Sequence, residues 1–242
     1  MPDHHGTGRA SRSRRSIREP IERIAVSEYD PLDYSSLARS CLVQLELQPM
    51  YRLPLSIAFN GAGVYALYYA GSFEPYSEYT PPEGQAPVRP IYAGKAEPAG
   101  ARKGAASGAA TRGQELLSRL RQHAKSLESV ENLKASEFRC RFLVVVPLWI
   151  RMVERFLIEQ TRPPWNGPLE GFGIHDPGKN RNPDVSWWDA MHPGRPAQLK
   201  WKAMIQFTRS QQDAQNRLHE WLAKPEEARE IVMDDEADGR AP

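Results

Sequence analysis

The segments GAGVYALYYAG (61–71) and PIYAGKAEPAG (90–100) decide the fold of this 242-residue chain. Both contain a run of aromatic and small apolar residues that is typical of a short β-strand. Each run sets one tyrosine near a glycine, Tyr65 in the first segment and Tyr92 in the second. Glycine permits another backbone to approach closely. We therefore expect two strands, each with a tyrosine next to a point of close backbone contact.

The rest of the chain predicts helices and further strand structure around these two segments. The expected elements are helices over 33–48, 114–127, 148–160 and 198–223, one helical turn at 187–191, and strands over 64–69, 91–95 and 138–146. Residues 71–90 hold five prolines and two glycines, which predicts an inserted loop. The order strand, strand, helix, strand, helix indicates an α+β domain, with helices packed on a small sheet.

The composition excludes several broad classes of protein. Lys+Arg number 32 and Asp+Glu number 30, so the chain is neither a wholly basic histone-like protein nor a wholly acidic disordered one. The longest apolar run, 142–150, has nine residues, whereas a membrane-spanning helix needs about 20. Two cysteines exclude a disulfide framework and a four-thiolate zinc site. Arginines stand where a secretory signal would be apolar, so we expect a soluble cytoplasmic protein.

The distribution of charge predicts where the folded domain begins and ends. Residues 1–20 carry five arginines against two acids, which is typical of a disordered basic tail, and we expect this tail to span 1–30. Residues 224–242 carry three basic and seven acidic residues, which predicts an acidic tail. Residues 95–202 carry 18 Lys+Arg against 11 Asp+Glu, a net charge of +7 that suits a polyanion. One domain over 31–223 is therefore expected.

Six residues in chain order form a candidate catalytic set: Tyr65, Tyr92, Arg119, His123, Glu154 and Asn166. Arg119 and His123 are four residues apart in an expected helix, so they share one face. Glu154 lies on the next helix, and Asn166 follows it by twelve residues. Each residue alone is usually structural, because strand tyrosines mostly pack and helical Arg/His pairs are mostly solvated. The set becomes informative because all six appear in order on suitable elements.

With these motifs the chain resembles the GIY-YIG nuclease superfamily, whose name-giving motif reads GVY…YAG here. The resemblance extends to type II restriction endonucleases of that superfamily that cut the palindrome CCGCGG. Further blocks carry it: ELLSRLRQH (115–123), CRF (140–142), PPWN (163–166), GFGIHDPG (171–178) and WWDAMHPGR (187–195). The restriction branch resembles this sequence in having an insertion like 71–90. The resemblance implies a small antiparallel three-stranded sheet flanked by helices, with long loop insertions, and a site-specific deoxyribonuclease.

The resemblance also implies a division of chemical labour. Hydrolysis of a phosphodiester needs a water nucleophile, a base, charge neutralisation and help for the leaving oxygen. Glu154 would hold one Mg²⁺, for which Mn²⁺ can substitute, because Mg²⁺ keeps most of its waters and accepts a single protein carboxylate. Arg119 would clamp the scissile phosphate. Either Tyr65 or His123 would act as the base, since a free phenol, with a pKa of about 10, needs help from a neighbour.

The remaining members of the set have supporting roles under the same resemblance. Tyr92 would position water or phosphate, Asn166 would brace the site, and Lys95 is a candidate phosphate contact. Glu159 is the rival metal ligand, but it lies five residues after Glu154 and hence on another helix face. The segment 69–71, Tyr-Ala-Gly, imitates the second half-motif but lies too close to the first half to reach a second strand.

Other functions are weaker interpretations of the sequence. Pro183-Asp184 with Lys200 imitates a different nuclease pattern, Pro-Asp…acid-x-Lys, but Gln198 stands where the carboxylate is needed. A GIY-YIG homing or repair nuclease would usually append a separate DNA-binding domain. A catalytically silent DNA-binding protein on the same scaffold is the non-enzymatic alternative, and the intact set of six argues against it.

Partners and specificity follow from the same resemblance. One motif set per chain and a palindromic target with two scissile phosphates predict a homodimer on double-stranded DNA. The matching blocks over 171–195 extend into loops, where we expect bases to be read. Arg181 and Arg195 would donate to guanine there, and His192 is expected in the same DNA-facing loops. The expected target is a GC-only palindrome, with CCGCGG the leading candidate and a cognate DNA methyltransferase in the same system.

Overall fold

The computed structural model of the protein describes residues 34–98, 113–173, 185–195 and 209–232. The chain divides into two units, Met1–Leu32 and Asp33–Pro242, and every described residue lies in the second. The helices and strands are α1 (Tyr34–Glu46), β1 (Tyr51–Arg52), β2 (Gly63–Tyr69), β3 (Pro90–Ala96), α2 (Glu115–Glu128), β4 (Phe138–Val144), α3 (Ile150–Thr161), α4 (Trp187–Met191) and α6 (Gln211–Leu222). Short 3₁₀ turns are η1 (Glu74–Tyr79), η3 (Ala135–Glu137), η4 (Pro147–Trp149), η5 (Pro164–Asn166) and η6 (Glu226–Ala228).

The sheet has four strands in the order β1-β4-β2-β3, and each neighbouring pair is antiparallel. The α+β class is confirmed, but the expected count of three strands is wrong. The additional strand, β1, consists of Tyr51 and Arg52, which pair with Cys140 and Arg139 of β4. A strand of two residues has no alternating pattern, so no periodicity in the sequence could reveal it.

The two half-motifs lie on neighbouring strands. Tyr65 of β2 is opposite Gly94 of β3, and Tyr92 lies within β3. Tyr69 belongs to β2 itself. The assignment of the second strand to the segment around Tyr92, in place of 69–71, is therefore confirmed.

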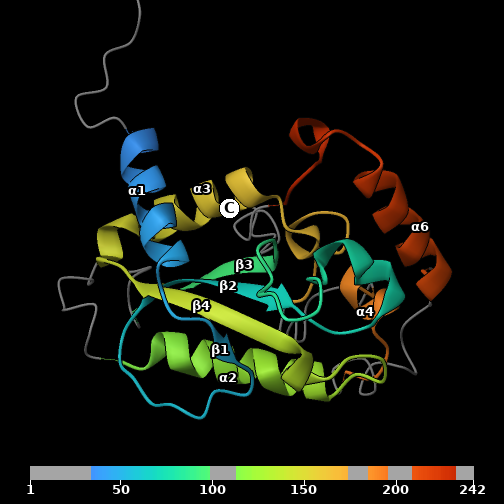
Figure 1. Ribbon diagram of the computed structural model, residues 1–242, viewed down its shortest axis with the longest axis horizontal. Helices are drawn as coiled ribbons and strands as arrows, with labels where there is room; N and C mark the ends of the chain where they lie inside the picture. Colours follow the sequence, from blue (N-terminus) through green and yellow to red (C-terminus); the bar gives the residue numbers. More distant parts are fainter. Residues whose placement is uncertain (1–33, 99–112, 174–184, 196–208, 233–242) are drawn as a thin grey trace, which may run out of the picture. The chain divides into compact units, whose positions relative to one another are not determined.

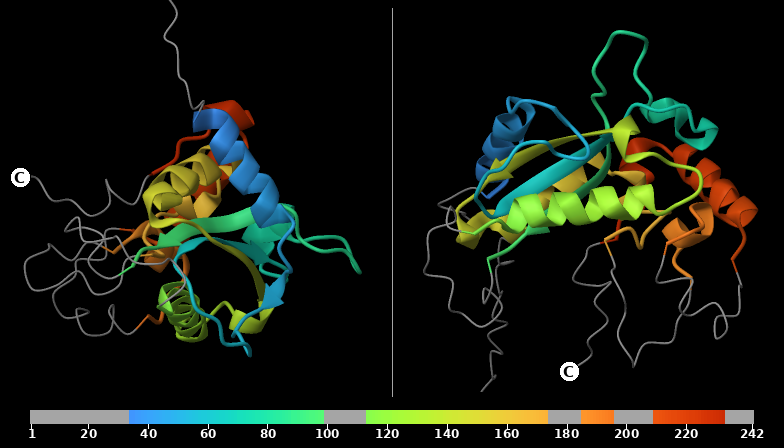
Figure 2. Two further views of the ribbon diagram at one scale, coloured as in Figure 1. Left: turned by 90° about the vertical axis from the view of Figure 1, so that its left-hand side faces the viewer. Right: turned by 90° about the horizontal axis from the view of Figure 1, so that it is seen from below.

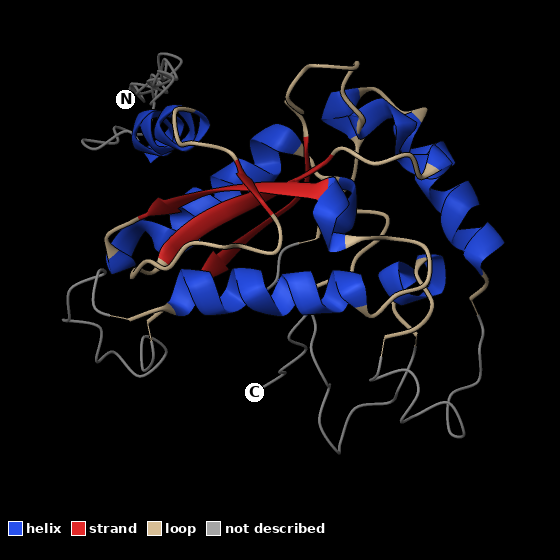
Figure 3. Cartoon of the chain, turned by 60° about the horizontal axis from the view of Figure 1, so that its bottom comes forward, coloured by secondary structure: helices blue, strands red, loops and turns tan. Residues whose placement is uncertain are grey.

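Helices cover both faces of the sheet (Figure 1). Helix α2 lies on one face, and α1 and α3 lie on the other, an arrangement that Figure 2 shows from two further sides. Helices α4 and α6 pack against each other beyond one end of the sheet (Figure 3). Because both faces are covered, every residue of β2 is buried and its sequence is apolar without alternation.

Alternate residues of β2 enter two different cores. Tyr65, Leu67 and Tyr69 join a large aromatic cluster on the α2 face. Ala66 and Tyr68 join a smaller cluster with residues of α1 and α3 on the opposite face. The period of two therefore decides that the motif tyrosine Tyr65 points toward α2.

The folded body extends beyond the expected boundary at residue 223. Arg229 is buried, Ile231 packs against the cluster under α1 and α3, and the Val232 amide donates to the Asn166 carbonyl at 2.6 Å. The expected acidic tail from residue 224 is thus partly attached to the folded body, at Arg229, Ile231 and Val232, although residues 224–228 and 230 are exposed. Composition was misleading here, because hydrogen bonds to distant parts of the chain and the packing of Ile231 hold the segment. The expected tail over 1–30 and residues 233–242 lie outside the described part of the chain.

Candidate active site

A tyrosine–histidine pair lies between β2 and α2. Tyr65 Oη and His123 Nε2 are 2.6 Å apart and form a buried hydrogen bond between residues 58 positions apart in sequence. His123 is 0% exposed, although its neighbour at the i−4 position, Arg119, is only partly buried. The helix therefore presents His123 to the sheet and Arg119 to the rim of the site.

Aromatic rings fix the orientation of the histidine. The ring of Phe172 stacks on His123 with centroids 4.5 Å apart and an interplanar angle of 20°. Tyr92 meets the same imidazole edge-on, with centroids 5.4 Å apart. Tyr65 and Tyr92 are themselves 6.2 Å apart, centroid to centroid. The two motif tyrosines and His123 thus form one packed group.

Two glycines make room for the tyrosine hydroxyls. A Cβ atom at Gly94 would lie 2.5 Å from Tyr65 Oη. A Cβ atom at Gly173 would lie 2.5 Å from Tyr92 Oη and 3.6 Å from the Arg119 Nη2 atom, which donates to the Gly173 carbonyl at 3.1 Å. Both positions need glycine, because a tyrosine hydroxyl lies close to where a Cβ atom would be. Gly94 makes room for Tyr65 beside β3, and Gly173 makes room for Tyr92 near Arg119.

Glu154 lies on α3, which covers the opposite face of the sheet from α2, and it contacts β3 from that face. Its side chain is buried and forms an ion pair with Lys95, which follows Gly94 in β3. Glu159, the rival metal ligand, is paired instead with Arg155 at 2.8 Å on the outer part of the helix. The structure therefore brings Glu154, and not Glu159, to the strand that carries the second half-motif.

Asn166 contacts the same strand at its outer edge. The Ala93 amide donates to Asn166 Oδ1 at 2.8 Å, and Asn166 Nδ2 donates to the Ala93 carbonyl at 3.0 Å. The side-chain amide thus occupies the position of a further strand beside β3. Tyr92, one of the six candidate residues, belongs to the stretch Tyr92–Lys95 of β3. The other five contact or border this stretch.

The expected positions of His192 and Arg195 are wrong. His192 is 0% exposed and hydrogen-bonds Tyr76 and Asn132. Arg195 is 5% exposed, with its Nε 3.2 Å from Asp189 Oδ1 and its guanidinium over the Trp188 ring at 4.2 Å. Both are core residues and neither faces a DNA-sized partner.

The reason for this error is visible in the contacts. The HPGR motif is typical of a surface loop, but the groups that cover it come from distant segments of the chain. Arg181, the other expected guanine donor, lies outside the described residues.

Sequence reasoning also missed the contribution of Phe172 and Gly173. Both belong to the block GFGIHDPG, which was interpreted as a DNA-facing loop. An aromatic residue between two glycines was the available signal, since glycines allow close packing on both sides. Lys95, the candidate phosphate contact, forms an ion pair with Glu154.

Among the described residues, no three or more His, Cys, Asp or Glu side chains form a group that could hold a metal ion. In the same part of the chain, no helix is long and apolar enough to cross a membrane.

Comparison with known proteins agrees with this geometry. The family model described as the Eco29kI GIY-YIG domain, a restriction endonuclease family, matches residues 57–222. The matched span covers more than half of the chain and includes all six candidate residues. None of the curated proteins compared with the chain gives a significant match. The chain therefore belongs to the Eco29kI GIY-YIG domain family, and it is a GIY-YIG nuclease.

Proposed function

We propose that this nuclease is a type II restriction endonuclease of the cytoplasm, which hydrolyses double-stranded DNA in a Mg²⁺-dependent reaction at a GC-rich palindrome. The observation that carries the proposal is the buried hydrogen bond between Tyr65 Oη and His123 Nε2. Hydrolysis needs a base at a place where water can be activated. A phenol held against an imidazole can accept one proton while it passes another on.

In the proposed reaction the Tyr65 hydroxyl donates to His123 Nε2. The attacking water gives a proton to Tyr65 Oη as the phenolic proton moves to Nε2. The resulting hydroxide forms the new bond to phosphorus, and the bond from phosphorus to the 3′ oxygen breaks, after which that oxygen takes a proton from solvent. The imidazole supplies the basicity that a phenol, with a pKa of about 10, lacks at neutral pH.

Mg²⁺ fits the donor that the site offers. A carboxylate oxygen suits a hard cation, and Mg²⁺ completes its shell with waters and substrate phosphate oxygens. The Glu154 carboxylate is paired with Lys95, so a bound Mg²⁺ would share the carboxylate with this ammonium or displace it. When bound, the metal would neutralise charge on the phosphate and on the leaving oxygen.

The other residues of the site would hold the substrate. Arg119 would place its planar guanidinium against a phosphate oxygen. Lys95 would contact a second phosphate oxygen, and Tyr92 would position water or phosphate. Asn166 would brace β3, a role supported by its two hydrogen bonds to Ala93.

Substrate choice and assembly complete the proposal. We expect CCGCGG as the target, cut by a homodimer whose two sites act on the two strands, with a cognate methyltransferase in the same system. Arg181 remains the proposed guanine donor. Sedimentation with a cognate duplex should give two chains per DNA, and one chain per duplex with both strands cut would contradict the dimer.

The decisive test compares two acidic residues of one helix. Glu154→Ala should lower plasmid cleavage by at least about 10³-fold, because the charge stabilisation by a metal is worth several kcal/mol. Glu159→Ala is the matched control and should cut at the wild-type rate. DNA binding should persist in both variants, since the basic surface and not the carboxylate holds the phosphates.

Sequencing the ends of digested genomic DNA tests the specificity. A common CCGCGG site is expected. Ends at a shared site with A·T pairs would overturn the target only, and ends without a common sequence would favour a repair or homing nuclease. A protein that binds plasmid DNA with Mg²⁺ present and leaves it intact would be the catalytically silent scaffold.

A further inference from the structure

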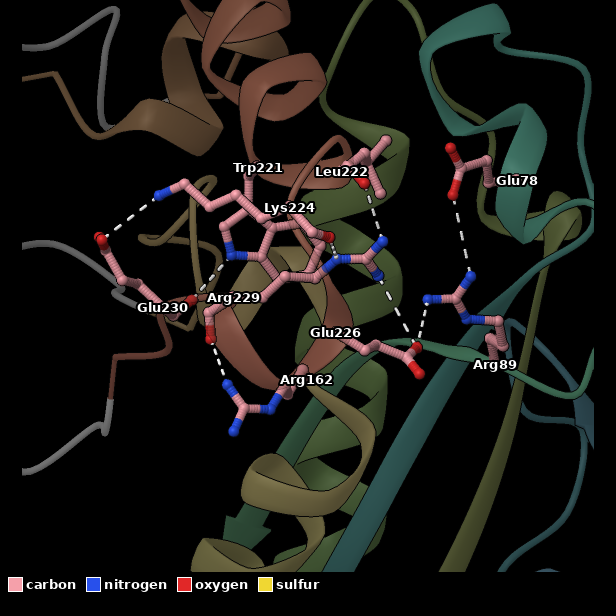
Figure 4. A network of polar contacts seen from close by, with 9 residues as sticks. All are labelled: Glu78, Arg89, Arg162, Trp221, Leu222, Lys224, Glu226, Arg229 and Glu230. Carbon is pink, nitrogen blue, oxygen red and sulfur yellow. Dashed lines mark hydrogen bonds and ion pairs between the residues drawn. The ribbon is translucent and has the colours of Figure 1, made fainter.

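Residues 223–232, which we call the C-terminal strap, follow α6 and lie beyond the span that the family model matches. The strap carries three glutamates, and its sequence is typical of a solvated end. The structure instead holds it with a network of polar contacts (Figure 4). The arrangement of these contacts suggests a role, because the network leads toward the active site.

The first set of contacts folds the strap back onto the end of α6. The Trp221 indole N–H donates to the Glu230 carbonyl at 2.9 Å. Arg229 donates to the Leu222 carbonyl at 2.9 Å and to the Lys224 carbonyl at 3.2 Å, and its guanidinium lies over the Trp221 ring. Arg229 therefore satisfies carbonyls at the helix end and fixes the shape of the strap.

The second set ties the strap to distant parts of the chain. Glu226 pairs with Arg89 of the 71–90 insertion at 2.8 Å. Arg162, which ends α3 in a left-handed conformation with φ 41°, donates to the Arg229 carbonyl. These contacts join the strap to the insertion and to the helix that carries Glu154 (Figure 4).

The third set reaches η5, the turn that presents Asn166. The Val232 amide donates to the Asn166 carbonyl at 2.6 Å. At the next residue, Gly167, a Cβ atom would lie only 2.8 Å from the Glu230 carbonyl oxygen, so the strap can approach this closely only over glycine. The strap therefore contacts two successive residues, Asn166 and Gly167, and the side chain of the first forms two hydrogen bonds with Ala93.

We propose that the C-terminal strap is a positioning element of the active site. It fixes the main chain of Asn166, whose amide fixes Ala93, and Ala93 lies between Tyr92 and Gly94. The strap touches no reacting group, and it acts through Asn166 on the strand that carries Tyr92 and Lys95. This inference rests on the proposed nuclease function, for which those residues matter.

The sharpest test removes a single donor. Val232→Pro deletes the N–H that the Asn166 carbonyl accepts, and Val232→Ala is the matched control because it keeps that N–H. A small misplacement of reacting groups can cost about 10²-fold, so we expect Val232→Pro to lower kcat about 10- to 100-fold. KM, and the Kd for DNA measured without metal, should stay within about twofold of wild type, since only the reacting geometry changes.

Truncation after Val232 is a second control. It removes the acidic residues 234–236 and 238 while leaving the strap intact. A loss of rate in this truncation equal to that of Val232→Pro would assign the effect to tail charge and overturn the proposal. Equal kcat values for Val232→Pro and Val232→Ala would overturn it too. A wild-type protein that cuts no DNA would instead overturn the nuclease proposal.

Arg162→Met keeps the proposal testable if Val232→Pro does not fold. It removes the donor to the Arg229 carbonyl at the end of α3 and leaves the core unchanged. Arg155→Met removes an equal charge from the exposed part of the same helix and serves as its control. We expect Arg162→Met to lower kcat about tenfold relative to Arg155→Met, again with unchanged KM. Equal kcat values for these two variants would contradict the positioning role.

Discussion

Two histidines of the chain, His123 and His192, are fully buried, and each hydrogen-bonds a tyrosine through Nε2. The first pair, with Tyr65, lies beside the half-buried Arg119 at the rim of the site. The second pair, with Tyr76, lies in the aromatic core between η1 and α4. Identical partner chemistry thus occurs once in a proposed catalytic setting and once in a structural one.

The surroundings of the second pair define where each proton lies. Asn132 Nδ2 donates to the Met191 carbonyl at 2.9 Å, so its Oδ1 faces His192 and accepts from Nδ1 at 2.8 Å. A neutral imidazole with its proton on Nδ1 must accept at Nε2, so the Tyr76 hydroxyl donates there. The Tyr76 oxygen in turn accepts from the Trp165 indole N–H at 2.9 Å.

Burial holds this second pair in one protonation state. Burial, with a smaller contribution from Arg195, lowers the pKa of His192 well below its usual range. Burial also raises the pKa of Tyr76 well above its usual range. The network is closed and its groups resist titration, which suits a structural element. Comparison of the two pairs shows that a Tyr–His hydrogen bond alone does not identify a catalytic group. The first pair differs from the second in having the partly buried Arg119 on the same helix as its histidine.

The largest expected effect separates the two pairs by activity. Tyr65→Phe should lower cleavage about 10²- to 10⁴-fold, the usual contribution of an acid–base group. It should also lower the free energy of unfolding by about 1–3 kcal/mol, because the buried His123 Nε2 loses the Tyr65 hydroxyl. Plasmid cleavage and thermal unfolding measured on the same sample provide the check. A variant that cuts at the wild-type rate would exclude Tyr65 from the proton transfer.

The next largest effect is expected at Arg195, whose charge contributes, after burial, to the lowered pKa of His192 in the second pair. Arg195→Met should lower the free energy of unfolding by about 3 kcal/mol, because it removes the cation that faces the partly buried Asp189 carboxylate. Urea unfolding measures this change. A selective loss of cleavage at the cognate site, with stability unchanged, would restore Arg195 as a base-reading residue.

Tyr76→Phe is the mirror of Tyr65→Phe and should act on stability. It leaves the Trp165 indole N–H and His192 Nε2 without the hydroxyl that joins them, and each such buried group costs about 1–3 kcal/mol. The free energy of unfolding should therefore fall by at least about 2 kcal/mol, while kcat below the melting temperature stays near the wild-type value. Loss of kcat in the folded variant would contradict the assignment.

The smallest effect is a pH dependence. His192 is neutral when folded and has an ordinary pKa of about 6.5 when unfolded, so below that pH the unfolded chain binds the extra proton. The stability that a neutral His192 contributes is complete above pH 6.5 and declines by up to about 1.4 kcal/mol per pH unit as the pH falls. Wild type should therefore lose its advantage over His192→Gln between pH 6.5 and pH 4.5, in urea unfolding. A constant difference would mean that His192 is protonated in the fold.

The sequence predicted the elements that carry the candidate residues better than it predicted the segments around them. The elements that carry Tyr65, Tyr92, His123 and Glu154 follow from local signals, the strand composition near a glycine and the helical spacing of apolar residues. The burial of His192 and Arg195 could not be predicted, because their partners Tyr76, Asn132 and the Phe172 carbonyl approach from other segments. Likewise, the ordering of residues 224–232 depends on donors such as Arg162, more than sixty positions away.

The grip of Asn166 on Ala93 has a consequence for solubility. β3 is an edge strand, and open N–H and C=O groups along an edge invite pairing with another chain. In the centre of β3, the N–H and C=O groups of Ala93 are both hydrogen-bonded to the Asn166 side chain. A strand of another chain therefore cannot pair with β3 at this residue. The opposite edge, β1, is only two residues long. The β3 margin of the sheet is thus protected at its centre against intermolecular β-pairing, and loss of the Asn166 side chain would open it to aggregation.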